Sequence, residues 1–312
     1  MSLPLPLFRS KSRRWSIPIS RQWTWSSPST GLLLALFATG LFVLIGALVR
    51  LLSDDIGLAQ ILFCRQVVFL LLLLPFCKGV EARSLIPSHW PLHLLRIVAA
   101  LAALSLGYLA VSQLPLADAT ALGFVYVPFA AIIATGVLKE SIPPERWWAI
   151  AVGFVGVMLM VQPRFDHPAL WPILAGLGAA MATAIAASCV RRLAQSESRL
   201  LLLGIQALAV GMLVLVPALL QWQHPTPNQW GLLMAVGALS ALATGLGITA
   251  LKHCPAHRIA QVEYAKMIYA LALGYGLFAE VPNALAWSGL LILLASALLP
   301  GLTTRARRKR SD

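Results

Sequence analysis

The stretch PLADATALGFVYVPFAAIIATGVLKESIPPERW, residues 115–147, recurs in altered form as PAHRIAQVEYAKMIYALALGYGLFAEVPNALAW at residues 255–287. The two segments align without a gap at a fixed shift of 140 residues, and the alignment extends back to residues 90 and 230. Eleven of the 58 aligned positions are identical, among them two tryptophans, a proline and a glutamate. Apolar composition alone readily produces leucine and alanine matches but not this set. The chain therefore contains an internal repeat.

The composition excludes a water-soluble globular domain. Hydrophobic residues make up 59% of the 312 residues and charged residues 11%, against about 45–50% and about 25% in an average soluble protein. The mean hydropathy is +0.81, so much of the surface must face lipid. The four cysteines form no CxxC pair. They are predicted to be small buried side chains and not a disulfide framework or a metal site.

Ten apolar segments approach the 17–25 residues that a helix needs to cross a bilayer. Short clusters of proline, glycine or charged residues separate them. They lie at about 31–49, 57–77, 92–111, 116–138, 145–161, 169–190, 200–220, 230–250, 256–278 and 285–302. The predicted fold class is an all-α integral membrane protein with ten transmembrane helices.

The repeat divides the ten helices into two groups of five. Because five is an odd number, the second group must be inverted in the membrane relative to the first. Inverted repeats are typical of transporters whose substrate site lies between the halves. We expect four parts: a basic tail at 1–29, five-helix repeats at 30–163 and 164–302, and a second basic tail at 303–312.

Lysine and arginine are unevenly distributed between the two sides. With the N-terminus in the cytoplasm, the inner tails and loops hold nineteen of these residues and the outer loops only Arg50 and Arg164. This asymmetry predicts that both termini are cytoplasmic. The tails supply most of the net charge of +13 and are expected to contact anionic lipid headgroups rather than nucleic acid.

Two passages resemble a known family. Residues 115–163, which continue beyond the repeated stretch as WAIAVGFVGVMLMVQP, are similar to helices 4 and 5 of an EamA-type member of the drug/metabolite transporter superfamily. Residues 261–299 are similar to helices 9 and 10 of that family. The resemblance implies a bacterial inner-membrane carrier or exporter with a central cavity lined mainly by helices 1, 3, 4, 6, 8 and 9. One departure is Lys139, because the family often has glycine before the glutamate that ends helix 4.

Charged side chains inside the spans are the strongest site candidates, because each costs about 2.5–3.5 kcal/mol at the membrane centre on insertion scales. Glu263 and Lys266 in helix 9 are three residues apart and share a helix face. They form either a self-neutralising structural pair or a polar face on the cavity that would suit a zwitterionic metabolite. In a further alternative, Glu263 takes up a coupling proton. The predicted substrate-binding set is Thr120, Phe124, Tyr126, Glu263, Tyr264 and Lys266.

Several other residues are predicted to serve the structure. Glu140 and Glu280 precede helices by a few residues and are expected to favour the exposed N–H groups of those helices. Pro128 should kink helix 4, and Ile268 stands at the related position, so the halves are expected to differ there.

Two further charges are not assigned to the substrate site. Arg65 in helix 2 is expected to snorkel or to bind a carbonyl oxygen. Asp118 lies within one turn of the outer end of helix 4, where water can reach it.

The sequence therefore predicts a secondary transporter that moves a small polar or amphipathic metabolite across a bacterial inner membrane by alternating access, with export favoured. The alternative is an uptake carrier of the same fold. A membrane enzyme or an ATP-driven pump is disfavoured, because the chain has no GxSxG, HExxH or P-loop sequence. A channel, which needs no exchange between two gates, is also disfavoured. The predicted partners are the substrate, the bilayer and, in one interpretation, a coupling proton. The chain is expected to be a monomer or a homodimer and to bind no cofactor or metal.

Overall fold

A computed structural model of the chain describes residues 28–77, 87, 89–136, 144–162, 170–194, 197–253 and 262–296. All regular secondary structure in these ranges is helical. The predictions made for both tails, Lys139 and Glu140 lie outside the described residues.

The described helices account for the ten predicted spans. They are α1 (Pro28–Ser53), α2 (Leu58–Leu73) with the 3-10 turn η1 (Leu74–Cys77), α3 (Trp90–Gln113), α4 (Leu116–Phe124), α5 (Tyr126–Gly136), α6 (Pro144–Val161), α7 (Leu170–Leu193), α8 (Arg199–Leu220), α9 (Pro227–His253), α11 (Ala265–Phe278) and a last helix at Ala284–Ser296. α4 and α5 together make one span. Seven spans are long and apolar enough to cross a membrane, and Trp147–Val161, Ala265–Phe278 and Ala284–Ser296 are shorter. The predicted fold class is confirmed.

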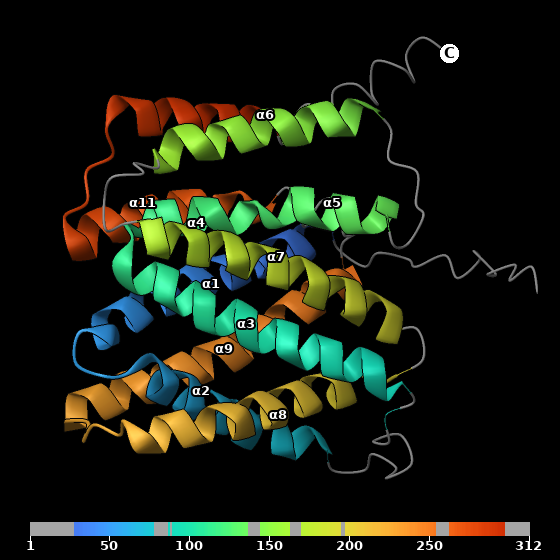
Figure 1. Cartoon of the computed structure of the whole chain (residues 1–312), viewed down its shortest axis with the longest axis vertical. Helices are drawn as coiled ribbons and strands as arrows, with labels where there is room; N and C mark the ends of the chain where they lie inside the picture. The colour runs from blue at the N-terminus through green and yellow to red at the C-terminus, as the bar shows by residue number, and fades with distance from the viewer. Residues whose placement is uncertain are drawn as a thin grey trace, which may run out of the picture.

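The helices run roughly parallel or antiparallel in one bundle (Figure 1). We call the end that carries residues 53–58, 114–115 and 279–283 the distal end, at the left of Figure 1, and the opposite end the tail end. α3 packs against α7, and α2 against α8 and α9. α11 lies between α1 and α4, so three segments far apart in the sequence meet along its length.

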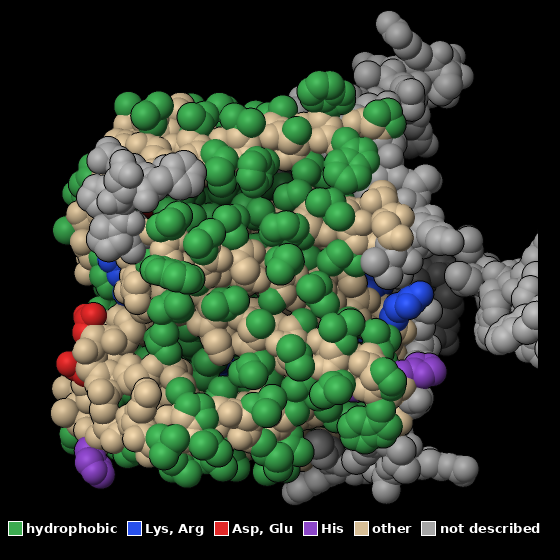
Figure 2. All heavy atoms as spheres, in the orientation of Figure 1, with side chains coloured by type: hydrophobic (Ala, Val, Ile, Leu, Met, Phe, Trp, Pro, Cys, Tyr) green, Lys and Arg blue, Asp and Glu red, His purple; other side chains and the backbone are tan. Residues whose placement is uncertain are grey.

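The flank of the bundle is apolar, as a lipid-facing surface requires. Figure 2 shows hydrophobic side chains over the visible flank, whereas the visible acidic and histidine side chains gather at the two ends. Leu33, Leu94, Met212 and Leu291 are among the well-exposed apolar side chains of the helices. Such exposure would be a liability in water and is expected in a bilayer.

α6 and the Ala284–Ser296 helix lie side by side, as Figure 1 shows at the upper edge of the bundle. A Cβ atom at Gly156 would lie 2.8 Å from the carbonyl oxygen of Gly289, and one at Gly289 would lie 2.6 Å from that of Gly156. The two backbones therefore touch. In lipid, where burial of apolar surface does not drive helix association, such close packing of small residues supplies much of the attraction.

Helix 4 is interrupted, as the proline predicts, but the interruption lies ahead of Pro128. α4 ends at Phe124, Val125 forms a turn, and α5 begins at Tyr126. Because Pro128 has no N–H group, the carbonyl oxygen of Phe124 loses its helical partner four residues on. The break therefore falls one turn before the proline itself.

Helix 9 is also interrupted, which corrects the expectation that the two halves differ there. Residues 262–263 are helical, Tyr264 forms a turn, and α11 begins at Ala265. Ile268 stands where the first half has Pro128, so a missing N–H group does not cause this break. The two interruptions lie within one residue of related positions of the repeat, since Val125 corresponds to Ala265.

Candidate functional site

The two interrupted helices meet through their aromatic side chains. The rings of Phe124 and Tyr264 stack with a centroid distance of 5.1 Å and an angle of 2° between their planes. These positions are related by the 140-residue shift of the repeat. The contact therefore joins corresponding points of the two halves, at the place where inverted-repeat transporters hold their substrates.

Glu263 and Lys266 share a helix face, as the sequence predicts. The Lys266 Nζ atom lies 3.6 Å from Oε1 of Glu263, and the side chains of Lys266 and Glu263 are 26% and 33% exposed. The Lys266 ammonium group also lies 6.0 Å from the ring centre of Phe42 on α1. At that distance the ring face attracts the cation, so α1 contributes to the surroundings of the pair.

The remaining predicted residues differ in their relation to this pair. Tyr126 and Tyr264 pack against the buried cluster that contains Phe124. The Thr120 hydroxyl donates a hydrogen bond to the carbonyl oxygen of Leu116 at 2.7 Å, within its own helix. The structure thus brings Tyr126 to the cluster beside Tyr264, whereas no described contact joins Thr120 to the charged pair.

A second cross-helix contact lies at the distal end. Glu280, just after α11, forms an ion pair with Arg50 near the end of α1. Its Oε2 atom accepts a hydrogen bond from the backbone N–H of Leu116 at 2.9 Å. The Arg50 guanidinium also stacks over the Phe278 ring, with its central carbon 4.2 Å from the ring centre. We call Arg50, Glu280 and the Leu116 N–H the distal latch.

Glu280 was predicted to interact favourably with the N–H groups of the helix that follows it. The choice of helix was wrong. Glu280 does cap a helix N-terminus, where a carboxylate is favourable, but the helix is α4. Asn283 caps the following helix instead, because its Oδ1 atom accepts the Ala286 N–H at 2.8 Å.

Local backbone geometry turns Glu280 toward its partners. Ala279 adopts a left-handed conformation (φ 52°), which costs about 1 kcal/mol in a residue other than glycine. The N–H groups of Ala279 and Glu280 both donate to the carbonyl oxygen of Gly274. A Cβ atom at Gly274 would lie 2.7 Å from Oε2 of Glu280. This glycine therefore leaves the space that the carboxylate occupies.

Below the latch, apolar side chains close the space between α1, α4 and α11. Val43, Ala47, Leu116 and Ala270 form a cluster in which none is more than 5% exposed. We call these four residues the distal plug. Tyr269, Leu273 and Phe278 are among the residues that pack against it. The Lys266 and Glu263 side chains are more exposed than the plug, at 26% and 33%.

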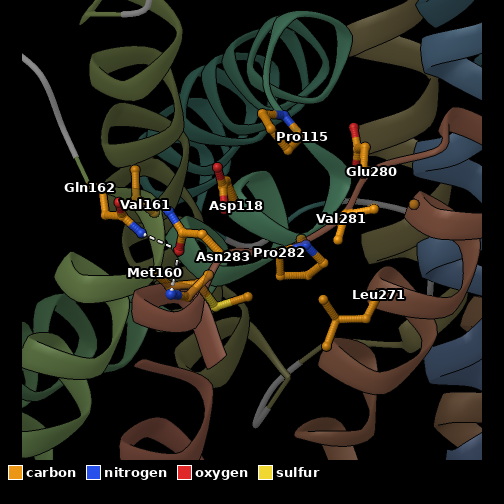
Figure 3. Close-up of a pocket in the computed structure, with 13 residues that line it drawn as sticks. Pro115, Asp118, Met160, Val161, Gln162, Leu271, Glu280, Val281, Pro282 and Asn283 are labelled. Atoms are coloured by element: carbon orange, nitrogen blue, oxygen red, sulfur yellow. Dashed lines mark hydrogen bonds between the residues drawn. The ribbon is translucent and has the colours of Figure 1, made fainter. Parts of the chain in front are cut away.

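A pocket of about 410 Å³ opens beside the latch at the distal end (Figure 3). In this view the Asp118 side chain lies between Pro115 on one side and Gln162 with Asn283 on the other. Asp118 is half-buried. The amides of Gln162 and Asn283 exchange two hydrogen bonds of 2.8 and 3.0 Å, which join the ends of α6 and the last helix. Glu280 lines the pocket as well, so it belongs to both pocket and latch.

Arg65 has a structural role, but with a partner that the sequence did not predict. Its Nε atom donates to the Ser240 hydroxyl at 2.9 Å, and its Nη1 atom lies 3.4 Å from Oε1 of Gln66. The Gln66 atom is the carbonyl oxygen of its side-chain amide, so one of the two expected alternatives is met. The bond to Ser240 also ties α2 to α9.

Sequence reasoning assigned no role to a buried polar group near the tail end. Arg96 on α3 is 1% exposed and donates to the Leu202 carbonyl oxygen and to Oε1 of Gln206 on α8. One turn away, Nε2 of His93 lies 2.6 Å from Oε2 of Glu197, and both side chains are buried. The signal was available, since an arginine inside a span is rare and needs partners. Among the described residues, no group of His, Cys, Asp and Glu side chains is placed to hold a metal ion.

Comparison with known proteins identifies the class to which this fold and repeat belong. The model of the EamA-like transporter family matches residues 29–162 and, a second time, residues 170–301. The chain therefore belongs to the EamA-like transporter family of the drug/metabolite transporter superfamily and is a multi-pass membrane protein. Both the family resemblance and the pair of repeats are confirmed.

Its relatives transport different small molecules in different directions. The chain is 27% identical to the pseudopaline exporter of Pseudomonas aeruginosa, over 86% of this chain and 95% of that one. It is also 27% identical to a riboflavin transporter of Vibrio cholerae, over 91% and 97% of the two chains. An S-adenosylmethionine uptake transporter of Rickettsia prowazekii is 25% identical, over 77% and 81%. A crystal structure of a protein with 16% sequence identity shares the fold, with a TM-score of 0.63 over 89% of this chain and 98% of that one.

Proposed function

We propose that this chain is a secondary transporter that moves a small zwitterionic metabolite across a bacterial inner membrane by alternating access. The observation that carries the proposal is the partly exposed charge pair Glu263–Lys266 beside the Phe124–Tyr264 stack. Interrupted helices at the interface of two inverted repeats commonly form substrate sites. Charges inside membrane spans are rare and mark such pathways.

The geometry of the pair suits a substrate that carries both charges. The ammonium group of a zwitterion would lie toward Glu263 and its carboxylate toward Lys266, with the ring of Tyr126 or Tyr264 offering a face to the cation. Because the two side chains lie 3.6 Å apart and are partly exposed, a zwitterion can replace their mutual contact without leaving either charge unpaired. Thr120, on the same helix as Phe124, completes the proposed set.

The relatives support two directions of transport. The pseudopaline exporter supports export, which we favour. The riboflavin transporter is named without a direction, whereas the S-adenosylmethionine carrier is an uptake protein and supports the alternative.

We further propose that both termini are cytoplasmic, so that the distal end faces the periplasm, because lysine and arginine accumulate on the tail side. The proposed parts are the tails 1–29 and 303–312 and the repeats 30–163 and 164–302.

The test uses Glu263→Gln, Lys266→Met and the double variant in purified proteoliposomes. A metabolomic comparison of cells with and without the gene supplies the candidate substrate. If the pair serves only the structure, each single variant leaves a lone charge and folds poorly, and the double variant recovers both expression and flux. If the pair binds substrate, the double variant folds and does not transport, and substrate no longer protects it against heat. Full flux by the double variant would disprove the site assignment.

Two controls sharpen this test. Gln229→Ala removes a hydrogen bond of 2.9 Å to Asp55 at the exposed distal end, away from the pair, and should transport normally. Flux with and without an imposed pH gradient distinguishes the coupling-proton alternative, in which Glu263→Gln keeps substrate exchange but loses proton-driven accumulation.

A further inference from the structure

The distal latch joins three helices that surround the proposed substrate path. Glu280 follows α11, Arg50 lies in the last turn of α1, and the N–H of Leu116 begins α4. One carboxylate thus holds the distal ends of three segments separated by up to 230 residues in the sequence. Its removal frees all three ends together.

The space between these helices is closed at the distal end. The distal plug lies directly below the latch and is almost completely buried. Gly123 lies seven residues after Leu116 on α4, and therefore on the same helix face. A Cβ atom at Gly123 would meet nothing within 4 Å, and the residue is exposed. The face of α4 that is buried in the plug at Leu116 is therefore exposed two turns deeper, at Gly123.

The latch is built so that it can open. The side chains of Arg50 and Glu280 are 23% and 17% exposed, so their attraction is screened less than that of a surface pair. Glu280 also lines the 410 Å³ pocket, and water there can solvate the carboxylate after separation. A fully buried ion pair would leave two uncompensated charges when broken. The Arg50 and Glu280 side chains are partly exposed, so water can solvate them after they separate.

We propose that Arg50 and Glu280 form the distal gate of the transport cycle, with the distal plug as its seal and the 410 Å³ pocket as its vestibule. The structure then represents the state closed at the distal end. When the transporter turns toward the distal side, the ion pair breaks, Leu116 loses its capping carboxylate, and the plug residues separate. This inference rests on alternating access as proposed above but not on the assignment of the substrate-binding residues.

The test measures cysteine labelling from both sides of the membrane without substrate. The four native cysteines are replaced, and single reporters are introduced as Ala47→Cys in the plug and Gly123→Cys below it. A membrane-impermeant maleimide is applied to right-side-out and inside-out vesicles. With the native latch, the Ala47→Cys reporter should be protected from the distal side and the Gly123→Cys reporter should be labelled from the tail side.

Loss of the latch should change the labelling rates of the two reporters in opposite directions. With Glu280→Gln, we expect distal labelling of the Ala47→Cys reporter to rise about tenfold and tail-side labelling of the Gly123→Cys reporter to fall, because the population shifts toward the distally open state. Arg50→Lys keeps the charge but not the planar guanidinium, and should give an intermediate shift. It also serves as the readout if Glu280→Gln expresses poorly.

A matched control breaks another contact at the same end. Gln229→Ala removes the hydrogen bond of 2.9 Å to Asp55, which lies outside the latch, the plug and the pocket, and should leave both labelling rates unchanged. A rise at both reporters in the Glu280→Gln protein indicates loosened structure and overturns the gate. Unchanged labelling at both also overturns it. Neither outcome depends on whether Glu263 and Lys266 bind the substrate.

Discussion

Phe124 and Tyr264 occupy related positions of the internal repeat, 140 residues apart, and their rings lie parallel at 5.1 Å. Each ring lies at the interruption of its helix. The contact therefore joins corresponding positions of the two halves, next to the Glu263–Lys266 pair in the sequence of helix 9.

Removal of one ring should weaken the junction between the halves. Tyr264→Leu loses a stacked aromatic contact worth about 0.5–1.5 kcal/mol beyond its buried area. We expect lower thermal stability in detergent and slower flux. Tyr264→Phe keeps the ring and serves as the control, with near-native stability. Equal stability of the leucine and phenylalanine variants would contradict a role for the stack.

The close approach of α6 and the last helix should not tolerate a side chain. Gly156→Ala places a Cβ atom 2.8 Å from the backbone of the facing helix, and such overpacking costs about 1–3 kcal/mol. Gly231→Ala on α9 is the matched control, because its Cβ atom would meet nothing within 4 Å. Thermal unfolding of both purified variants should show a loss only for Gly156→Ala.

The buried Arg96 should contribute to stability rather than to transport. Arg96→Met removes the partner of the half-buried Gln206 amide oxygen, and an acceptor left without a partner away from water costs about 1–3 kcal/mol. We expect a lower unfolding temperature and unchanged KM for substrate. A raised KM at native stability would instead assign Arg96 to the substrate path.

The topology is testable with reporter fusions. A periplasmic reporter should be active when inserted after Asp54 or Gln223, which lie at the distal end between α1 and α2 and between α8 and α9. It should be silent at both termini, since positive charge is retained in the cytoplasm. Termini on opposite sides of the membrane would contradict five helices in each repeat, and with them the inverted arrangement.

Features that depend on the local sequence or on the internal repeat were predictable from the sequence. The ten spans follow from runs of apolar residues, and the inverted halves follow from the 140-residue repeat. The shared face of Glu263 and Lys266 follows from their spacing of three in a helix. The break near Pro128 follows from its missing N–H group. These features depend on composition, on the repeated segment, on the helix period and on the chemistry of one residue.

The tertiary structure alone decided which side chains meet across helices. The carboxylate of Glu280 binds Arg50, 230 residues away, and caps α4 rather than the helix that follows it. Arg96 finds its acceptors on α8. In lipid a helix can be apolar on every side, so its sequence does not specify how it is rotated or which neighbour it faces. Rotation and register are set only when neighbouring helices pack together, as α6 and the last helix do at Gly156 and Gly289.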